Sequence, residues 1–219
     1  MTQSSLVTSW AVCGIAAAAA RFVPVPLLDD VIRRRAAQVA VVRTLRAHGR
    51  TGSAEPLEAL WGEPEGRRKG VVRKVSRKLL LFPVRKYVAV FGAVRGVPND
   101  VMRVVLLGRA VDRRLQRGEL ADPEQARALR RAIDTAIAGL DLRLLTAGLA
   151  DGLSHSRGLS TAAVAYARRR FGKNGEADLE VDGAVAEGAE RVTEVLRRPE
   201  VAQLLEQYDA AVDRALAAG

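Results

Sequence analysis

The chain has 219 residues, 48% of them hydrophobic and 27% charged, and its 35 Lys and Arg outnumber its 25 Asp and Glu. This composition excludes a disordered tail protein and a polytopic membrane channel, because it supplies apolar residues for a core and too many charges for a series of spans. One cysteine and two histidines exclude an intrachain disulfide and leave too few ligands for a structural zinc site.

The positive charge is concentrated in the first half of the chain. Residues 1–118 hold 22 Lys and Arg against 8 Asp and Glu, whereas residues 119–219 hold 13 against 17. The extremes are residues 66–99, with ten cations and no acid, and residues 176–213, with eleven acids and three arginines. This asymmetry predicts an anionic partner for the first half, or contact between it and the acidic tail of the same chain or of a second copy.

Apolar residues recur with a helical period almost throughout, and alternation typical of strands is nearly absent. We therefore expect an all-α protein, a compact bundle of about 7–8 helices with a helical hairpin core interrupted by Pro and Gly. Its basic helical part is 1–118, with a Gly-, Pro- and Glu-rich linker at about 50–66, and its acidic helical part is 119–219. Together they are expected to form one compact domain.

The first expected helix covers about residues 5–22. Its apolar run from Trp10 to Ala20 has eleven residues, short of the ~18–20 that cross a bilayer. No Lys or Arg precedes it, whereas a secretory signal peptide begins with positive charge. We therefore expect a cytoplasmic protein that keeps this helix and acts in the cytosol or at the inner face of the cytoplasmic membrane. Cys13 is expected to be a buried apolar side chain.

A second helix is expected from Pro26 to Gly49, with Asp29 and Asp30 in its first turn, where the helix dipole favours anions. His48 lies at its C-terminal end, where a cation is favourable. After the linker, a basic helix is expected over about residues 67–81.

The basic helix carries the main functional prediction. Its cations recur at four-residue spacing on one face, and valines and a leucine occupy the other. A helix with these two faces is suited to an anionic lipid interface, or to an acidic protein partner. The residues expected to make this contact are Arg67, Arg68, Lys69, Arg73, Lys74, Arg77, Lys78, Arg85 and Lys86.

Other interpretations of the basic helix stay open. Its cations are equally compatible with the solvated face of a core helix, or with a cytosolic interaction module that binds no lipid. Nucleic-acid binding is disfavoured, because the segment lacks interleaved aromatic residues and no helix-turn-helix pair is evident. The acidic C-terminal helices are expected to serve self-association or to bind a basic partner.

The remaining helices are expected at about residues 98–117, 123–153, 160–171, 182–197 and 200–217. Asp122 and Pro123 form a typical helix start, and Ser160 or Thr161 is the expected cap of the helix that follows His155. The apolar residues of the 123–153 helix, Leu144 included, are expected to face inward.

No catalytic motif stands out. His155 lies beside two serines, but the G-x-S-x-G elbow and the strand before it are missing from the sequence. Asp134 and Asp141 are seven residues apart on one expected helix and would share a face, but Arg130 lies four residues before Asp134 and indicates a surface ion pair. Glycine loops that cradle phosphates are absent from the sequence as well. We therefore expect a non-enzymatic protein without metal, cofactor or small-molecule substrate, and an enzyme with a site inside the bundle is the alternative.

One stretch contains P-x-P-x-x-x-D between an Ala-rich helix and a helix with Gln38, and a second, residues 92–99, is similar to G-A-x-x-G-x-x-N. Together these two stretches resemble the EcsC-like proteins of bacteria. The resemblance covers about residues 10–118, and Arg95 and Pro98 depart from its pattern. It implies association with membranes or transport systems, with no established catalytic activity and no catalytic residues. The family-like positions are Pro24, Pro26, Asp30, Gly92, Gly96 and Asn99.

Overall fold

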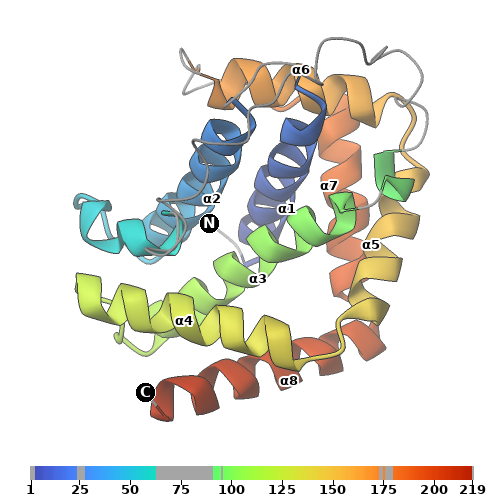
Figure 1. The fold of residues 1–219 in the computed structure, drawn as a ribbon. Coiled ribbons are helices and arrows are strands. Elements are labelled where there is room, and N and C mark those ends of the chain that lie inside the picture. The colour runs from blue at the N-terminus through green and yellow to red at the C-terminus, as the bar shows by residue number, and fades with distance from the viewer. Residues whose placement is uncertain are drawn as a thin grey trace, which may run out of the picture.

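The computed structural model describes residues 3–23, 28–62, 91–94, 96–172, 175 and 180–218. These residues contain helices and turns and no strand, which confirms the all-α prediction. Figure 1 shows the helices gathered into a bundle. The α-helices are α1 (Gln3–Ala19), α2 (Leu28–Ala47), α3 (Val97–Gln116), α4 (Pro123–Gly139), α5 (Arg143–Ser154), α6 (Leu159–Phe171), α7 (Gly183–Leu196) and α8 (Pro199–Ala217), and the 3-10 helices are η1 (Ala20–Phe22), η2 (Glu55–Leu60) and η5 (Phe91–Ala93).

Helix α1 is the centre of the bundle. It packs against α2, α3, α6 and α7, and Figure 1 shows it between α2 and α7. Its small side chains allow this close packing: a Cβ added at Gly14 would lie 3.0 Å from the carbonyl oxygen of Val101 in α3. The run from Ala16 to Ala20 is buried. Cys13 is buried as predicted.

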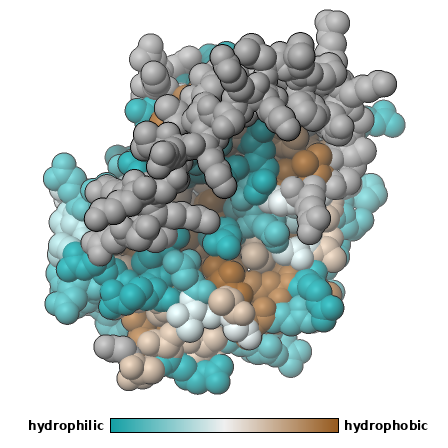
Figure 2. All heavy atoms as spheres, in the orientation of Figure 1, coloured by the Kyte–Doolittle hydropathy of each residue, from teal (hydrophilic) through white to brown (hydrophobic). Residues whose placement is uncertain are grey.

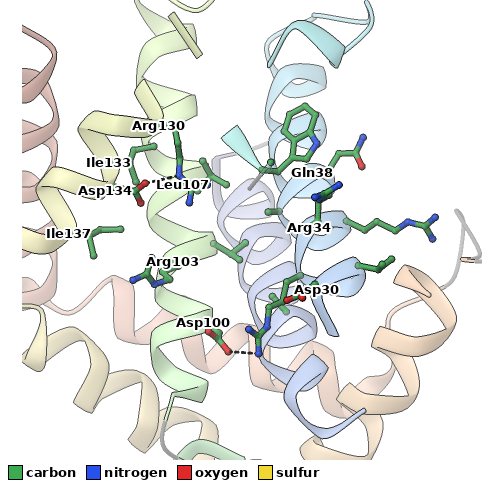
Figure 3. Close-up of a pocket in the computed structure, with 18 residues that line it drawn as sticks. Asp30, Arg34, Gln38, Asp100, Arg103, Leu107, Arg130, Ile133, Asp134 and Ile137 are labelled. Carbon is green, nitrogen blue, oxygen red and sulfur yellow. Dashed lines mark hydrogen bonds and ion pairs between the residues drawn. The ribbon is translucent and has the colours of Figure 1, made fainter. Parts of the chain in front are cut away.

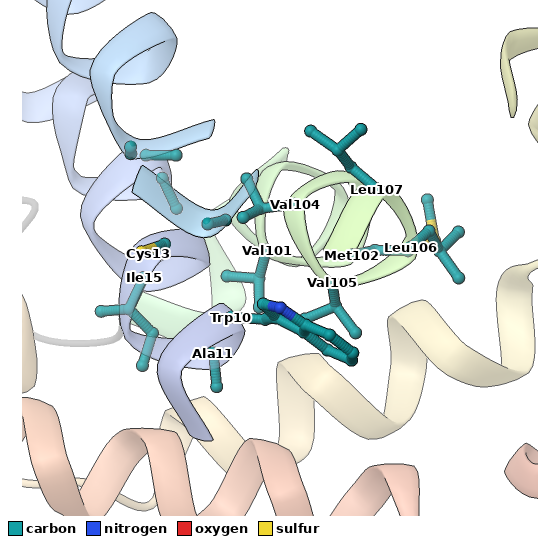
Figure 4. Close-up of a cluster of buried hydrophobic side chains, with 14 of the residues drawn as sticks. Trp10, Ala11, Cys13, Ile15, Val101, Met102, Val104, Val105, Leu106 and Leu107 are labelled. Atoms are coloured by element: carbon teal, nitrogen blue, oxygen red, sulfur yellow. The ribbon is translucent and has the colours of Figure 1, made fainter. Parts of the chain in front are cut away.

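The indole of Trp10 anchors the contact between α1, α2 and α3. Its Nε1 donates a hydrogen bond to Thr44 Oγ1 at 2.9 Å, and Thr44 in turn donates to the Ala40 carbonyl at 2.8 Å. The ring lies against Gly108, where a Cβ would come within 2.6 Å of ring atoms. Figure 4 shows the indole beside the valines that α3 turns toward α1. A glycine in α3 thus makes room for a large aromatic ring from α1.

Several expected helix ends are confirmed. The side chain of Asp122 accepts hydrogen bonds from the backbone nitrogens of Glu124 and Gln125, and Pro123 begins α4. Gly49 adopts a φ of 72° after α2, the left-handed conformation that glycine tolerates best. The predicted cap of α6 is wrong: Gly158, with a φ of 72°, precedes the helix, and Ser160 and Thr161 lie inside it.

The expected long helix at 123–153 is also wrong, because the chain breaks between α4 and α5. Leu140 is extended, and the Asp141 side chain accepts a hydrogen bond from the backbone nitrogen of Arg143 at 3.1 Å. A short acidic side chain that bonds a nearby backbone nitrogen competes with helix continuation. Asp134 and Asp141 therefore do not share a helix face. Because the helical period does not continue across the break, the inward positions of α4 do not carry over to α5, and Leu144 is 49% exposed instead of inward.

Aspartates of the acidic tail form ion pairs with arginines of the basic half, at positions that the sequence did not predict. Asp209 of α8, 4% exposed, accepts hydrogen bonds from Arg109 of α3 at 2.6–3.1 Å and lies 3.1 Å from Arg113. Asp213 pairs with Arg114 of α3 and with Arg117, which directly follows that helix. These arginines lie outside the 66–99 segment.

The described surface is largely hydrophilic in the view of Figure 2, with a smaller apolar area. Leu144 is the one large apolar side chain that is exposed among the described residues.

Candidate functional site

The basic residues predicted to contact an anionic surface lie outside the described residues, and their role stays a prediction. The two family-like prolines also lie outside the described residues. These residues are Arg67, Arg68, Lys69, Arg73, Lys74, Arg77, Lys78, Arg85, Lys86, Pro24 and Pro26.

The two family-like glycines have a structural role. A Cβ added at Gly92 would lie 2.8 Å from the backbone nitrogen of Ser154, and closer still to the Ala150 carbonyl oxygen, so this position holds η5 tightly against α5. Gly96 adopts a φ of 99° directly before α3, and a Cβ there would meet the guanidinium of Arg21 at 2.8 Å. Asn99 is exposed on the first turn of α3.

Asp30, another family-like position, lines a cleft of about 700 Å³ between α2, α3 and α4. Helix α1 contributes Ala17 to the lining, and Trp61 and Gly62, which follow η2, complete it. Figure 3 shows Arg34 and Gln38 on the α2 side of the cleft and residues of α3 and α4 on the other. The volume is within the range of small-molecule sites, about 300–1,000 Å³.

The described lining of this cleft is rich in arginine. Helix α2 supplies three, and α3 and α4 supply one each, whereas the same lining contains three aspartates. The arginines are Arg33, Arg34, Arg35, Arg103 and Arg130, and the aspartates are Asp30, Asp100 and Asp134. The cleft therefore has a surplus of positive charge.

Two of the aspartates are neutralised by arginines. Asp100 accepts hydrogen bonds from the Nε and, at 3.1 Å, from the Nη2 of Arg21, and Arg33 lies 3.9 Å away. The hydrogen bond to Asp100 raises the pKa of the Arg21 guanidinium. Asp134 accepts from Arg130 at 3.0 Å, the ion pair that the four-residue spacing predicted, and Arg130 also donates to the Leu60 carbonyl at 2.9 Å.

Three other arginines that line the cleft have N–H donors without an acceptor among the described residues: Arg33, Arg34 and Arg103. Within the described residues Arg34 and Arg103 are exposed and make no hydrogen bond or ion pair. The Nε of Arg33 is buried and lacks a hydrogen-bond acceptor. A buried polar group without a partner costs stability, and such groups often mark a place where a ligand or water binds. The cleft is therefore equipped to bind an anion.

The reactive residue types lie elsewhere. Burial raises the pKa of the Cys13 thiol to about 11, so this thiol stays protonated at neutral pH inside the core. His155, with a 65% exposed side chain, lies between α5 and α6, and its Nδ1 is 2.8 Å from the Asp151 carbonyl oxygen. His48 lies 2.7 Å from Asp112 Oδ1, a partner that sequence reasoning missed. Within the described residues His, Cys, Asp and Glu form no cluster able to hold a metal ion.

Comparison of the chain with protein-family models, curated proteins and solved structures found no match. Among the described residues, Ser5–Phe22 is long and apolar enough to cross a membrane, with a mean hydropathy of 1.4, but 72% of it is buried inside the bundle. The core helix of a soluble protein passes the same test, so this segment is weak support for a membrane span.

Proposed function

We propose that this protein is a non-enzymatic, peripheral accessory protein that binds an anionic lipid surface through the cations of residues 66–99. The segment carries ten cations and no acid. Each Lys or Arg near an anionic membrane contributes roughly 1 kcal/mol, and the attraction extends over about one Debye length.

The observation that carries this proposal is where the cationic segment joins the bundle. Gly62, shortly before it, lines the arginine-rich cleft, and Arg103, shortly after it, lines the same cleft. Arg34 and Arg103 are exposed in that cleft. The burial of α1 among other helices supports peripheral contact over insertion.

Vesicle flotation of the full chain tests the proposal. Wild type is expected to float with vesicles containing phosphatidylglycerol and not with phosphatidylcholine alone. The variant R73E/K74E/R77E/K78E is expected to bind about 10²–10³-fold more weakly, because four attractive charges are lost. Raising the salt from about 0.1 to 1 M should reproduce part of this loss, since the Debye length falls from about 10 to 3 Å.

The matched control is R127E/R131E/R157E/R168E, which makes the same change in net charge at four exposed arginines of the described surface. It should keep most of the vesicle binding. The proposal fails if wild type ignores anionic vesicles, as a purely cytosolic interaction module would, or if the control loses as much binding as the test variant. It also fails if the test variant unfolds, because the four cations would then be structural.

A further inference from the structure

The arginines of the cleft that lack an ion-pair partner among the described residues indicate the charge of the anion that would fit there. Among the described residues that line it there are five arginines and three aspartates, an excess of two positive charges. Arg34 and Arg103 make no ion pair within the described residues. A phosphate monoester carries a charge of about −1.5 to −2 at pH 7, which matches this excess.

The shape of the donors favours phosphate as well. A guanidinium presents a planar fork of N–H donors that bonds two oxygens of one phosphate. A phosphate has enough oxygens to serve several such donors at once, whereas a carboxylate has two.

Much of the remaining lining of the cleft is apolar. Side chains of Trp61, Val104, Leu107, Ile133 and Ile137 line it beside the arginines. Its volume of about 700 Å³ is much larger than an inorganic phosphate needs. Pockets of this size with apolar walls and a few charged groups hold ligands that have an apolar body and a polar end.

We propose that the cleft between α2, α3 and α4 is a binding site for an organic phosphate, with Arg34 and Arg103 holding the phosphate and the apolar wall holding its body. This site goes beyond the surface contact proposed for residues 66–99 and uses different residues. The same chemistry is offered by a soluble phosphate ester and by the headgroup of a phosphorylated lipid.

Isothermal titration calorimetry of the full chain distinguishes the two sources. The probes are phenyl phosphate, monomeric dihexanoyl phosphatidic acid and inorganic phosphate. We expect at least one of the two organic phosphates to bind more tightly than inorganic phosphate, because only they reach the apolar wall. Binding of the phosphatidic acid alone assigns the site to a lipid headgroup, and binding of phenyl phosphate alone assigns it to a soluble ester.

The variant R34Q/R103Q should weaken binding of the organic phosphate by about 10²-fold, since each charge-assisted contact is worth roughly tenfold in affinity. The matched control R127Q/R131Q removes two exposed arginines of α4 that do not line the cleft, and it should change affinity less than twofold. Circular dichroism and a thermal melt check that both variants fold like wild type.

The two proposals fail separately. R73E/K74E/R77E/K78E should keep the binding of the organic phosphate while losing anionic vesicles, and R34Q/R103Q should keep most vesicle binding. The cleft proposal is overturned if neither organic phosphate binds up to millimolar concentration, or if binding survives in R34Q/R103Q. Equal losses in R34Q/R103Q and R127Q/R131Q would also overturn it, because net charge alone would then explain the effect.

Discussion

At the scale of single residues, the buried hydroxyl of Thr44 makes two hydrogen bonds. It accepts the indole N–H of Trp10 and donates to the carbonyl of Ala40 one turn earlier. Trp10 is 3% exposed and Thr44 is fully buried, so water cannot replace either bond. The indole N–H thus depends on one side chain from a neighbouring helix.

Replacing Thr44 with valine keeps the shape and removes the acceptor, so the indole N–H is buried without a partner. We expect the free energy of unfolding to fall by about 1–3 kcal/mol, measured by urea denaturation. Thr193→Val is the matched control: this threonine is also buried and donates to the carbonyl four residues earlier, at Ala189. The Thr193→Val substitution should lower the free energy of unfolding by less, because no described donor loses its acceptor. Equal costs would show that the Trp10 bond contributes nothing.

At the scale of elements, the sequence predicted which segments are helical better than where they end. The starts at Asp122 and the stop at Gly49 depend on local chemistry, a side chain that caps and a glycine that accepts positive φ, so they are visible in the sequence. The break between α4 and α5 was missed, because an apolar helical period continues across it. The signal available in the sequence was Asp141, a short acidic residue at the break. In the structure the hydrogen bond from Arg143 lowers the pKa of Asp141 to about 2.

The contact between η5 and α5 gives an element-scale prediction. A methyl group at Gly92 would meet backbone atoms of Ala150 and Ser154, which cannot move aside as a flexible side chain can. Gly92→Ala should therefore lower stability by about 1–3 kcal/mol through overpacking, measured as a shift in thermal unfolding. Gly139→Ala is the control, since a Cβ there meets nothing within 4 Å and alanine favours helix. A Gly92→Ala protein as stable as wild type would mean that η5 moves freely from α5.

At the scale of the whole molecule, the arginine-rich cleft could not be predicted. Arg33, Arg34, Arg103 and Arg130 come from three helices, and only the packing of α2, α3 and α4 brings them to one cleft. In the sequence each is an ordinary polar residue on the outer face of an amphipathic helix. The pairing of Asp209 with Arg109 was missed for the same reason, because the two residues are 100 positions apart.

The buried carboxylate of Asp209 joins the basic half to the acidic half. Asp209→Asn removes its charge and leaves Arg109 and Arg113 near each other. We expect a loss of about 1–3 kcal/mol in unfolding free energy, since these arginines are partly exposed and water screens part of their repulsion. Glu206→Gln, an exposed change on the same helix, should stay within about 0.5 kcal/mol. If both variants unfold at the same urea concentration, the contact between α3 and α8 does not depend on this charge.

The central position of α1 has a consequence for biosynthesis. This apolar helix leaves the ribosome before its packing partners α3, α6 and α7, and α7 ends only at Leu196. Of these described partners and α2, only α2 follows α1 directly, and the bundle cannot close around the alanines of α1 before α7 has been made. Long-range contacts of this kind slow folding and leave apolar surface open to aggregation. The nascent chain therefore depends on protection of α1 until α7 has been made.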